Sequence, residues 1–190
     1  MTCIVGLVHK KVVYIGSDCL GSSADIQIPR IDAKIFKLCD RNDALIGFAG
    51  SYRVGQLLQY AKCLITPKVP CTHKGIVTKT LPKIYDIFDN AGLIKKNKLM
   101  SGEDSFLLAY KSKLFQIDVD FQVAESLRQY DAIGSGSSFA LGSLYSTEGM
   151  QDPIQRVYLA LKSASVFGVS IGPPFHIINT KDNTEMVFEI

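Results

Sequence analysis

The stretch Met1-Thr2-Cys3-Ile4-Val5-Gly6-Leu7-Val8-His9 organises the interpretation of the whole chain. It is apolar and rich in β-branched residues almost from its first position, whereas a mobile tail would be polar. We therefore expect this end to be tied into a sheet. A second apolar run, residues 12–18, follows after Lys10-Lys11, so the two runs predict a β-hairpin.

Thr2 acquires a distinct chemistry if Met1 is removed, and a small second residue generally permits that removal. Thr2 would then carry a hydroxyl and a free α-amine in one residue. The amine has a pKa of about 7.7–8.0, so it can take the proton of the hydroxyl near neutral pH. One residue would serve as nucleophile and general base. Many inert proteins also begin Met-Thr, so this expectation depends on the rest of the chain.

The composition excludes several classes of protein. The 190 residues favour a single domain, residues 1–190, with a core of its own. A net charge of +3 with scattered basic residues argues against nucleic-acid binding. No apolar run approaches the roughly 18 residues that cross a bilayer, and no signal peptide is recognisable, so we expect a cytoplasmic protein without membrane contact. The five cysteines form no Cys-x-x-Cys pair, so no metal site and no disulfide framework is predicted.

The hydrophobic periodicity predicts alternating groups of strands and helices. Further strands are expected at residues 35–38, 44–50, 106–110, 114–119, 129–133, 175–180 and 186–190. Helices are expected from Ser51 to Ala61, over 74–90 with an interruption at Pro82, near 139–145 and over 153–166. This order favours a layered α+β fold, in which each helical block covers one of two sheets, over a βαβ repeat.

Five short motifs occur in this order: Thr2, Gly16-Ser17-Asp18, Asp32-Ala33-Lys34, Gly47-Phe48-Ala49-Gly50 and Ile133-Gly134-Ser135-Gly136. Together with the element order they resemble the proteasome β-subunit family. The resemblance is closer to its bacterial relative, the HslV peptidase, or to a small bacterial or phage homologue. It covers nearly the whole chain and is strongest over residues 2–58. It implies an N-terminal-nucleophile hydrolase with a four-layer αββα sandwich, acting as a threonine peptidase.

The resemblance also implies a set of catalytic residues. Thr2 matches the nucleophile, Lys34 the catalytic lysine, and Asp18 the aspartate that keeps this lysine charged and oriented. An ammonium group beside Thr2 would lower the pKa of its hydroxyl and its amine. Gly50 matches the glycine whose N–H forms the oxyanion hole, a donor worth roughly 2.7–4 kcal/mol in comparable sites. Ser135 matches the serine of the loop beside the nucleophile.

Two further segments match the substrate clefts of the family. An extended peptide would lie between Leu20-Gly21-Ser22 and the backbone of Phe48 and Ala49, adding to both edges. Phe48 would help to line the specificity pocket, which implies an aromatic or aliphatic preference at the cleaved bond. The family further implies an unfolded polypeptide as substrate, a homo-oligomeric ring with enclosed active sites, an ATP-dependent unfoldase as partner, and no organic cofactor.

One departure concerns the end of the last long helix. Ser170 matches a serine of the family, but Phe167 occupies the position of the aspartate that orients this serine and the threonine amine. Two alternatives to an active peptidase therefore stay open. One is a catalytically inactive structural or assembly subunit of the same fold, and the other is an amidase of this fold that acts on a small molecule. A nucleophilic cysteine is disfavoured, because Cys3 would stand second after processing and Cys19 has the pattern of a packing residue.

Overall fold

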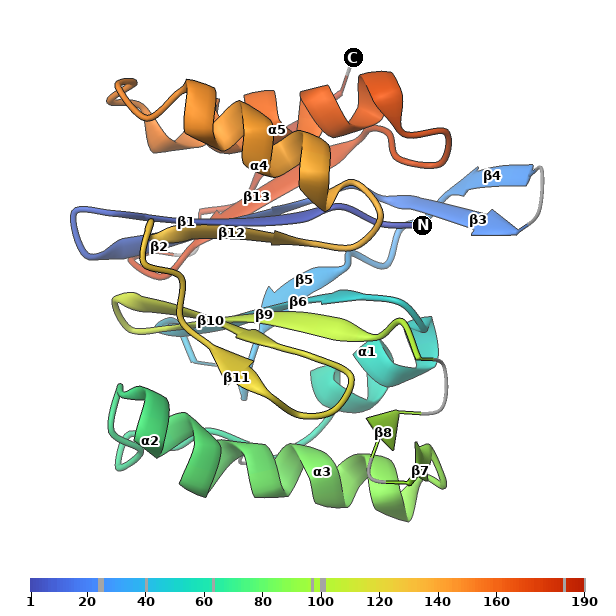
Figure 1. Cartoon of the computed structure of the whole chain (residues 1–190), viewed down its shortest axis with the longest axis vertical. Helices are drawn as coiled ribbons and strands as arrows, with labels where there is room; N and C mark the ends of the chain where they lie inside the picture. The colour runs from blue at the N-terminus through green and yellow to red at the C-terminus, as the bar shows by residue number, and fades with distance from the viewer. Residues whose placement is uncertain are drawn as a thin grey trace.

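The structure is a computed structural model that describes residues 1–23, 26–39, 41–62, 64–96, 98–99, 102–182 and 184–189, with the backbone alone for residues 22, 23, 98 and 99. Figure 1 shows two β-sheets stacked on one another, with helices on both outer sides. Across the described ranges, none of the helices has the length and apolar character that a membrane span requires.

The first sheet contains the N-terminal hairpin. Its antiparallel strand order is β12-β1-β2-β13-β14. The strands are β1 (Ile4–His9), β2 (Val12–Ser17), β12 (Tyr130–Ile133), β13 (Phe175–Asn179) and β14 (Met186–Phe188). The predicted pairing of the first two runs is confirmed, with Lys10 and Lys11 at φ angles of 48° and 67° in the turn. Two central residues with positive φ give the turn a twist that matches its strands.

The second sheet has the order β11-β10-β9-β6-β5. Its strands are β5 (Ile35–Lys37), β6 (Ala44–Ala49), β9 (Ser105–Tyr110), β10 (Lys113–Ile117) and β11 (Val123–Ala124). Two further hairpins stand outside both sheets: β3 (Leu20–Ser23) with β4 (Ile26–Pro29), and β7 (Ile94–Lys95) with β8 (Lys98–Leu99). The strands of these hairpins were not expected from the sequence.

The helices follow the predicted order. They are α1 (Tyr52–Gln59), α2 (His73–Gly75), the π-helical turn η1 (Ile76–Thr80), α3 (Leu81–Asn90), α4 (Ser137–Ser146) and α5 (Pro153–Phe167). Ser51 is the N-cap of α1, as predicted, but its side chain makes no capping hydrogen bond. The interruption expected at Pro82 is confirmed, because the regular α-helix begins only at Leu81 and Pro82 lies in its first turn.

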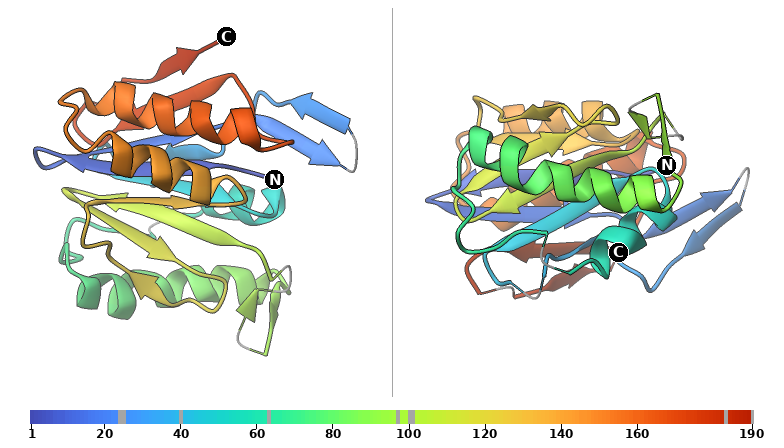
Figure 2. Two further views of the ribbon diagram at one scale, coloured as in Figure 1. Left: turned by 45° about the horizontal axis from the view of Figure 1, so that its top comes forward. Right: turned by 90° about the horizontal axis from the view of Figure 1, so that it is seen from below.

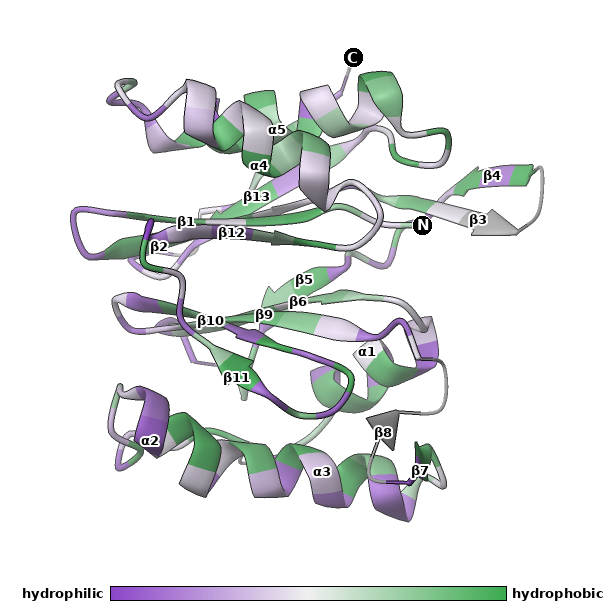
Figure 3. Ribbon diagram, viewed as in Figure 1, coloured by the Kyte–Doolittle hydropathy of each residue, from purple (hydrophilic) through white to green (hydrophobic). Residues whose placement is uncertain are grey.

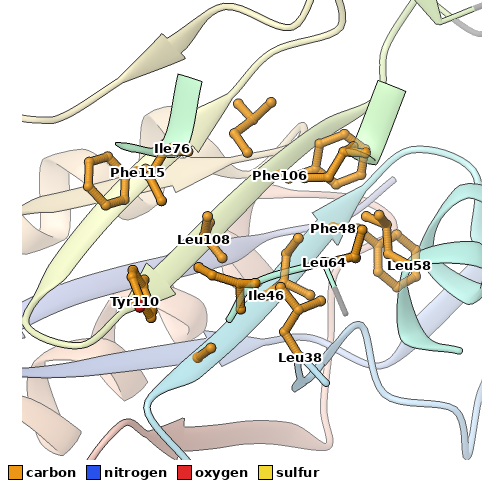
Figure 4. Packing of buried hydrophobic residues seen from close by; sticks show 14 of the residues in the cluster. Leu38, Ile46, Phe48, Leu58, Leu64, Ile76, Phe106, Leu108, Tyr110 and Phe115 are labelled. Carbon is orange, nitrogen blue, oxygen red and sulfur yellow. The ribbon is translucent and has the colours of Figure 1, made fainter. Parts of the chain in front are cut away.

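Three apolar cores hold these layers together. The first sheet packs on α4 and α5 through residues such as Val5, Ala140 and Leu161. The second sheet packs on α1, η1 and α3 through a cluster drawn in Figure 4, which includes Phe106 and Ile76. A third cluster fills the space between the two sheets. Figure 3 shows the corresponding hydrophobic colouring on the inner strands, with hydrophilic residues at the hairpin ends.

The β3–β4 hairpin projects beyond the two sheets in all views (Figures 1 and 2). It leaves the first sheet directly after β2, on the side where the chain begins. β3 pairs with β4 alone among the described strands, so its other edge has no strand partner there. This position brings the small-residue segment around Gly21 next to the N-terminal residues.

Candidate functional site

Thr2 lies just before β1 and is 6% exposed. Its backbone is held by the loop before α4: the Thr2 N–H donates to Ser135 Oγ at 3.3 Å, and the Gly136 N–H donates to the Thr2 carbonyl at 3.2 Å. Gly134 has φ +85°, and a Cβ atom there would lie 2.3 Å from the Thr2 carbonyl oxygen. The glycine is required both for the conformation and for the close approach. The loop therefore lies directly against the expected nucleophile.

Asp18 and Lys34 form a fully buried ion pair. Lys34 Nζ lies 2.9 Å from both carboxylate oxygens and also donates to the Leu20 carbonyl at 2.8 Å. Asp18 accepts the N–H groups of Cys3 at 2.9 Å and Leu20 at 3.2 Å. Burial raises the pKa of Asp18 above its ordinary value, while the charge of Lys34 and these N–H donors oppose the rise. Such complete hydrogen bonding is what a buried ion pair requires.

The Thr2 hydroxyl and the Lys34 ammonium meet at one atom. Thr2 Oγ1 donates to the Met1 carbonyl oxygen at 2.7 Å, and Lys34 Nζ donates to the same oxygen at 3.4 Å. With Met1 attached, the nitrogen of Thr2 belongs to a peptide bond and has no basic lone pair. The arrangement thus holds a hydroxyl and a cation together at the residue whose removal would free the amine.

A cleft of about 720 Å³ lies in front of Thr2. Gly50 forms part of its wall, with φ +107°. Besides Thr2 and Gly50, the cleft is lined by residues from four segments of the chain: Met1, Ala49, Ser51, Glu103, Ser105, Gly134 and Ser135. Four of the residues expected from the sequence, Thr2, Ala49, Gly50 and Ser135, are therefore brought together on one cavity.

The other expected substrate residues lie around this cleft in different environments. Leu20 is buried and offers its carbonyl to Lys34, while Gly21 pairs with Ile28 in the β3–β4 hairpin. The side chain of Ser22 lies outside the described residues. Phe48 points into the core of the second sheet, where its ring packs on Tyr52 at 5.6 Å between centroids. The Phe48 ring thus belongs to the apolar core and is not among the groups that line the cleft.

The end of α5 has Phe167 at the position that the resemblance assigns to an aspartate. Phe167 is 66% exposed, and its ring stacks on Phe139 with centroids 5.4 Å apart. Ser170 is buried in the segment that follows. This segment runs close to the site, because a Cβ atom on Gly136 would lie 2.6 Å from Ile171. Among the described residues, no hydrogen bond joins Ser170 to Thr2.

The cysteines near the site behave as packing residues. Cys3 and Cys19 are fully buried, and burial is the main cause that raises the pKa of each thiol to about 12, with the charge of Asp18 adding to it. Thiols with such a pKa stay protonated at neutral pH and are poor nucleophiles. Cys63 lies outside the described residues.

The sequence did not indicate Asp104, which lies next to the Gly50 turn. It is 2% exposed, and its Oδ1 accepts the Ser51 N–H at 2.7 Å. Residues 50 and 104 are far apart in the sequence, and Asp104 follows a Gly-Glu pair that suggests only a turn. No local pattern predicts this contact, which depends on the register of β6 and β9.

Comparison with solved structures defines the class of fold. The chain has the fold of HslV and its relatives, which confirms the predicted resemblance at the level of fold. BPH from Thiobacillus denitrificans superposes with a TM-score of 0.77 at 17% identity, covering 96% of this chain and 98% of that one. A structure of the same protein in complex with epoxomicin superposes equally well.

Two other solved structures are similar. Eukaryotic HslV from Trypanosoma brucei has a TM-score of 0.70 at 18% identity, covering 93% of this chain and 98% of that one. Anbu, an ancestral beta-subunit from Yersinia bercovieri, has a TM-score of 0.71 at 13% identity, with coverages of 98% and 86%. No family model and no curated protein sequence matches this chain. Identities this low establish the fold and leave activity to chemical argument.

Proposed function

We propose that the protein is a threonine peptidase of the N-terminal-nucleophile type, with the αββα sandwich of these hydrolases as one domain over residues 1–190. Thr2 becomes the nucleophile when Met1 is removed. The observation that carries this proposal is the meeting of Thr2 Oγ1 and Lys34 Nζ at the Met1 carbonyl oxygen. Removal of Met1 takes away that shared acceptor, so the hydroxyl and the ammonium would then face each other at the cleft.

The proposed reaction uses groups that the chain itself supplies. The Thr2 hydroxyl attacks the scissile carbonyl carbon and passes its proton to the Thr2 amine. The Gly50 N–H donates to the oxyanion that forms. When the tetrahedral intermediate collapses, the C–N bond breaks and the leaving amine takes the proton from the Thr2 ammonium. Water then cleaves the ester, with the amine again as base, and regenerates Thr2.

The role of Lys34 in this reaction is electrostatic. Its charge lies beside Thr2 and favours the deprotonated forms of the hydroxyl and the amine. Asp18 holds the ammonium in place through two contacts of 2.9 Å. The substrate would be an extended, unfolded polypeptide that pairs with the edge of β3 that has no strand partner among the described residues. We include Ser135, Ser170 and the backbone at Leu20, Gly21, Ser22, Phe48 and Ala49 in the proposed site.

Self-assembly is part of the proposal. Ile26 and Ile28 of β4 are 61% and 57% exposed, and the Gln27 side chain donates to the Val169 carbonyl, which brings the exposed Val169 beside them. An exposed apolar surface of this kind is typical of protein interfaces. We expect a homo-oligomeric ring, and by analogy an ATP-dependent unfoldase as partner. Sedimentation of the purified protein tests the first of these two expectations.

An inactive structural subunit of the same fold is the second candidate function. The exposed position of Phe167, stacked on Phe139, favours it, because no carboxylate comes from residue 167. An amidase for a small molecule is the third possibility, and it shares the nucleophile with the peptidase. Chemistry at Thr2 separates these candidates.

The test is the intact mass of the protein before and after treatment with epoxomicin, a peptide epoxyketone that reacts with a hydroxyl and a free amine on the same residue. We expect loss of the methionine mass and gain of one adduct. Thr2→Ala with Met1 still removed should give no adduct. Cleavage of an unfolded polypeptide by the same preparation would then support the peptidase.

The other outcomes each favour a rival. Retained Met1 without an adduct would rule out the threonine mechanism and support the structural subunit. Loss of Met1 without an adduct would point to the Phe167 position as the defect, or to the small-molecule amidase. Adduct formation without cleavage of any polypeptide would favour the small-molecule amidase.

A further inference from the structure

Asp104 and Gly50 lie face to face beyond the end of a strand pair. Ala49 opposite Ser105 is the last rung between β6 and β9, so Gly50 and Asp104 are the next residues outward. A Cβ atom on Gly50 would lie 2.2 Å from Asp104 Oδ1 and 3.0 Å from its Cα. The two backbones therefore approach so closely that residue 50 has no room for a side chain.

The carboxylate of Asp104 replaces the hydrogen-bond partner that the chain loses at this point. After Gly50 the backbone turns away from β9 to begin α1, and the Ser51 N–H no longer has a ladder acceptor. Asp104 Oδ1 accepts it at 2.7 Å. A partly buried N–H needs such an acceptor, and a bond to a charged group is roughly twice as strong as a neutral one. Asp104 thereby ties the turn to β9.

Successive residues of the segment 103–105 face opposite sides. Glu103 and Ser105 line the cleft that contains Thr2, whereas Asp104 between them does not. This alternation is that of an extended strand. Asp104 therefore contacts the Gly50 turn on the side away from the cleft, while the opposite side of the turn faces Thr2.

We propose that Asp104 is a positioning residue that holds the Gly50–Ser51 turn, so that the Gly50 N–H points at the carbonyl oxygen of a substrate attacked by Thr2. This inference rests on the proposed function and extends it to a residue that touches no substrate. An oxyanion donor acts only within a narrow range of distance to the developing charge. If the turn were released from β9, the Gly50 N–H would still be present, but it would no longer be held in the direction of the substrate carbonyl oxygen.

The test compares three variants of the Met1-free protein. Asp104→Ala removes the acceptor, and Asp104→Asn keeps a carbonyl oxygen that can accept the same bond. Asp120→Ala is the matched control. Asp120 and Asp104 line one surface hollow, and Asp120 also accepts a backbone N–H, that of Gln122 at 3.1 Å. The readouts are kcat and KM for a fluorogenic peptide and the hydrogen-exchange rates of the Gly50 and Ser51 amides.

We expect Asp104→Ala to lower kcat about 10- to 100-fold, the scale of a misplaced catalytic group, with KM within about twofold of the wild type. Asp104→Asn should restore kcat to within about threefold, and Asp120→Ala should leave it unchanged. The Ser51 amide should exchange about tenfold faster in the alanine variant and not in the asparagine variant.

Wild-type kcat in Asp104→Ala would overturn the inference, and so would an asparagine variant as impaired as the alanine variant. If the wild type neither cleaves peptides nor reacts with epoxomicin, the proposed function has failed, and hydrogen exchange alone then decides whether Asp104 holds the turn. Equal hydrogen-exchange rates of the Ser51 amide in the alanine variant and the wild type would show that Asp104 does not hold the turn. A melting temperature for each variant separates release of the turn from global unfolding.

Discussion

The two flanks of Thr2 are built from different chemistry. On the sheet flank, the end of β2 and the segment before β5 supply Asp18 and Lys34, a buried pair with all its contacts made. On the helix flank, Ser135 and Gly136 of the loop before α4 hydrogen-bond to the backbone of Thr2, and α5 ends at the exposed Phe167. Charge is thus concentrated on one flank, while the other flank sets the position of the main chain.

This difference follows the pattern of the resemblance. Residues 16–18 and 32–34, two of the motifs that carry the resemblance, form the charged flank. The departure at Phe167 lies on the other flank, where an exposed aromatic stack takes the place of a carboxylate. In the proposed function, the charged groups beside Thr2 therefore lie on the sheet flank, and the predictions below separate the contributions of the two flanks.

The largest expected effect comes from breaking the buried ion pair. Asp18→Ala leaves Lys34 charged, 1% exposed and without its carboxylate. Loss of one partner of such a pair costs about 3–5 kcal/mol of the free energy of unfolding. Urea denaturation at neutral pH measures this loss.

Asp32→Ala is the matched control for that experiment. Asp32 also pairs with a basic residue, Arg30, at 2.7 Å, but the two side chains are 33% and 39% exposed. We expect a change below about 1 kcal/mol, because solvent screens exposed pairs. Equal losses in the two variants would contradict the contrast between a buried and an exposed pair.

A smaller effect is expected on the helix flank from Gly134→Ala. The new Cβ would lie 2.3 Å from the Thr2 carbonyl oxygen at a φ angle of +85°, so either the loop or Thr2 must move. We expect a loss of about 1–3 kcal/mol in the free energy of unfolding, and slower reaction of Thr2 with epoxomicin. Thermal denaturation and the rate of adduct formation measure the two effects.

Gly142→Ala supplies the control on the same flank. Gly142 lies within α4, and a Cβ atom there meets nothing within 4 Å. Alanine should stabilise the helix by up to about 1 kcal/mol without changing the reaction at Thr2. A destabilised Gly142→Ala protein would show that α4 does not tolerate substitution in general. The loss in Gly134→Ala could then not be assigned to its contact with Thr2.

Much of the fold was predictable because local patterns and packing agree. The run from Ile4 to Val8 has no polar residue, which indicates a buried strand, and the switch of period after Gly50 marks the start of α1. The β3–β4 hairpin was not predicted, because Gly21 and the serines beside it do not follow the composition of a strand.

The site was predictable only where a residue belongs to a motif. Asp18 and Lys34 were indicated by the resemblance, and the structure brings them together from 16 positions apart. Asp104 was missed, because its contact with Ser51 spans 53 positions and needs the β6–β9 register. The inward position of the Phe48 ring was missed as well, because the sequence alone does not say which face of β6 meets the helices.

A third prediction concerns the thiols of the sheet flank at alkaline pH. Unfolding lowers the pKa of Cys3 and Cys19 from about 12 to the ordinary 9.0. Because the pKa is raised in the folded state, the stabilisation is complete below pH 9 and is lost as the pH rises toward 12. The free energy of unfolding should fall by up to about 1.4 kcal/mol per pH unit for each thiol above pH 9.

Denaturation of a Cys3→Ala, Cys19→Ala protein between pH 8 and pH 10.5 checks this slope. The double variant will be less stable at every pH, but its curve should be flatter than that of the wild type above pH 9. Cys39→Ala is the control, since its thiol is only half-buried. Parallel curves for the double variant and the wild type would show that folding does not raise the pKa of these two thiols.

The smallest effect is expected from Phe167→Asp, which places an acidic residue at the position that the resemblance assigns to an aspartate. The ring is 66% exposed and stacks on Phe139, so its loss should cost less than about 1 kcal/mol. A carboxylate at the last residue of α5 also meets the negative end of the helix, which adds only a few tenths of a kcal/mol. Because this side chain leaves the helix toward solvent, we expect the rate of peptide cleavage to change less than about twofold.

Phe167→Ala separates the loss of the ring from the gain of the charge. If the aspartate variant cleaves peptides at least tenfold faster than the alanine variant, residue 167 reaches Thr2 in the working protein, and the helix flank differs from the family by one carboxylate only. Equal rates would mean that the backbone after α5 takes a course that keeps residue 167 away from Thr2. In that case the orienting group must come from the segment that carries Ser170 and Ile171, which already packs on the loop before α4.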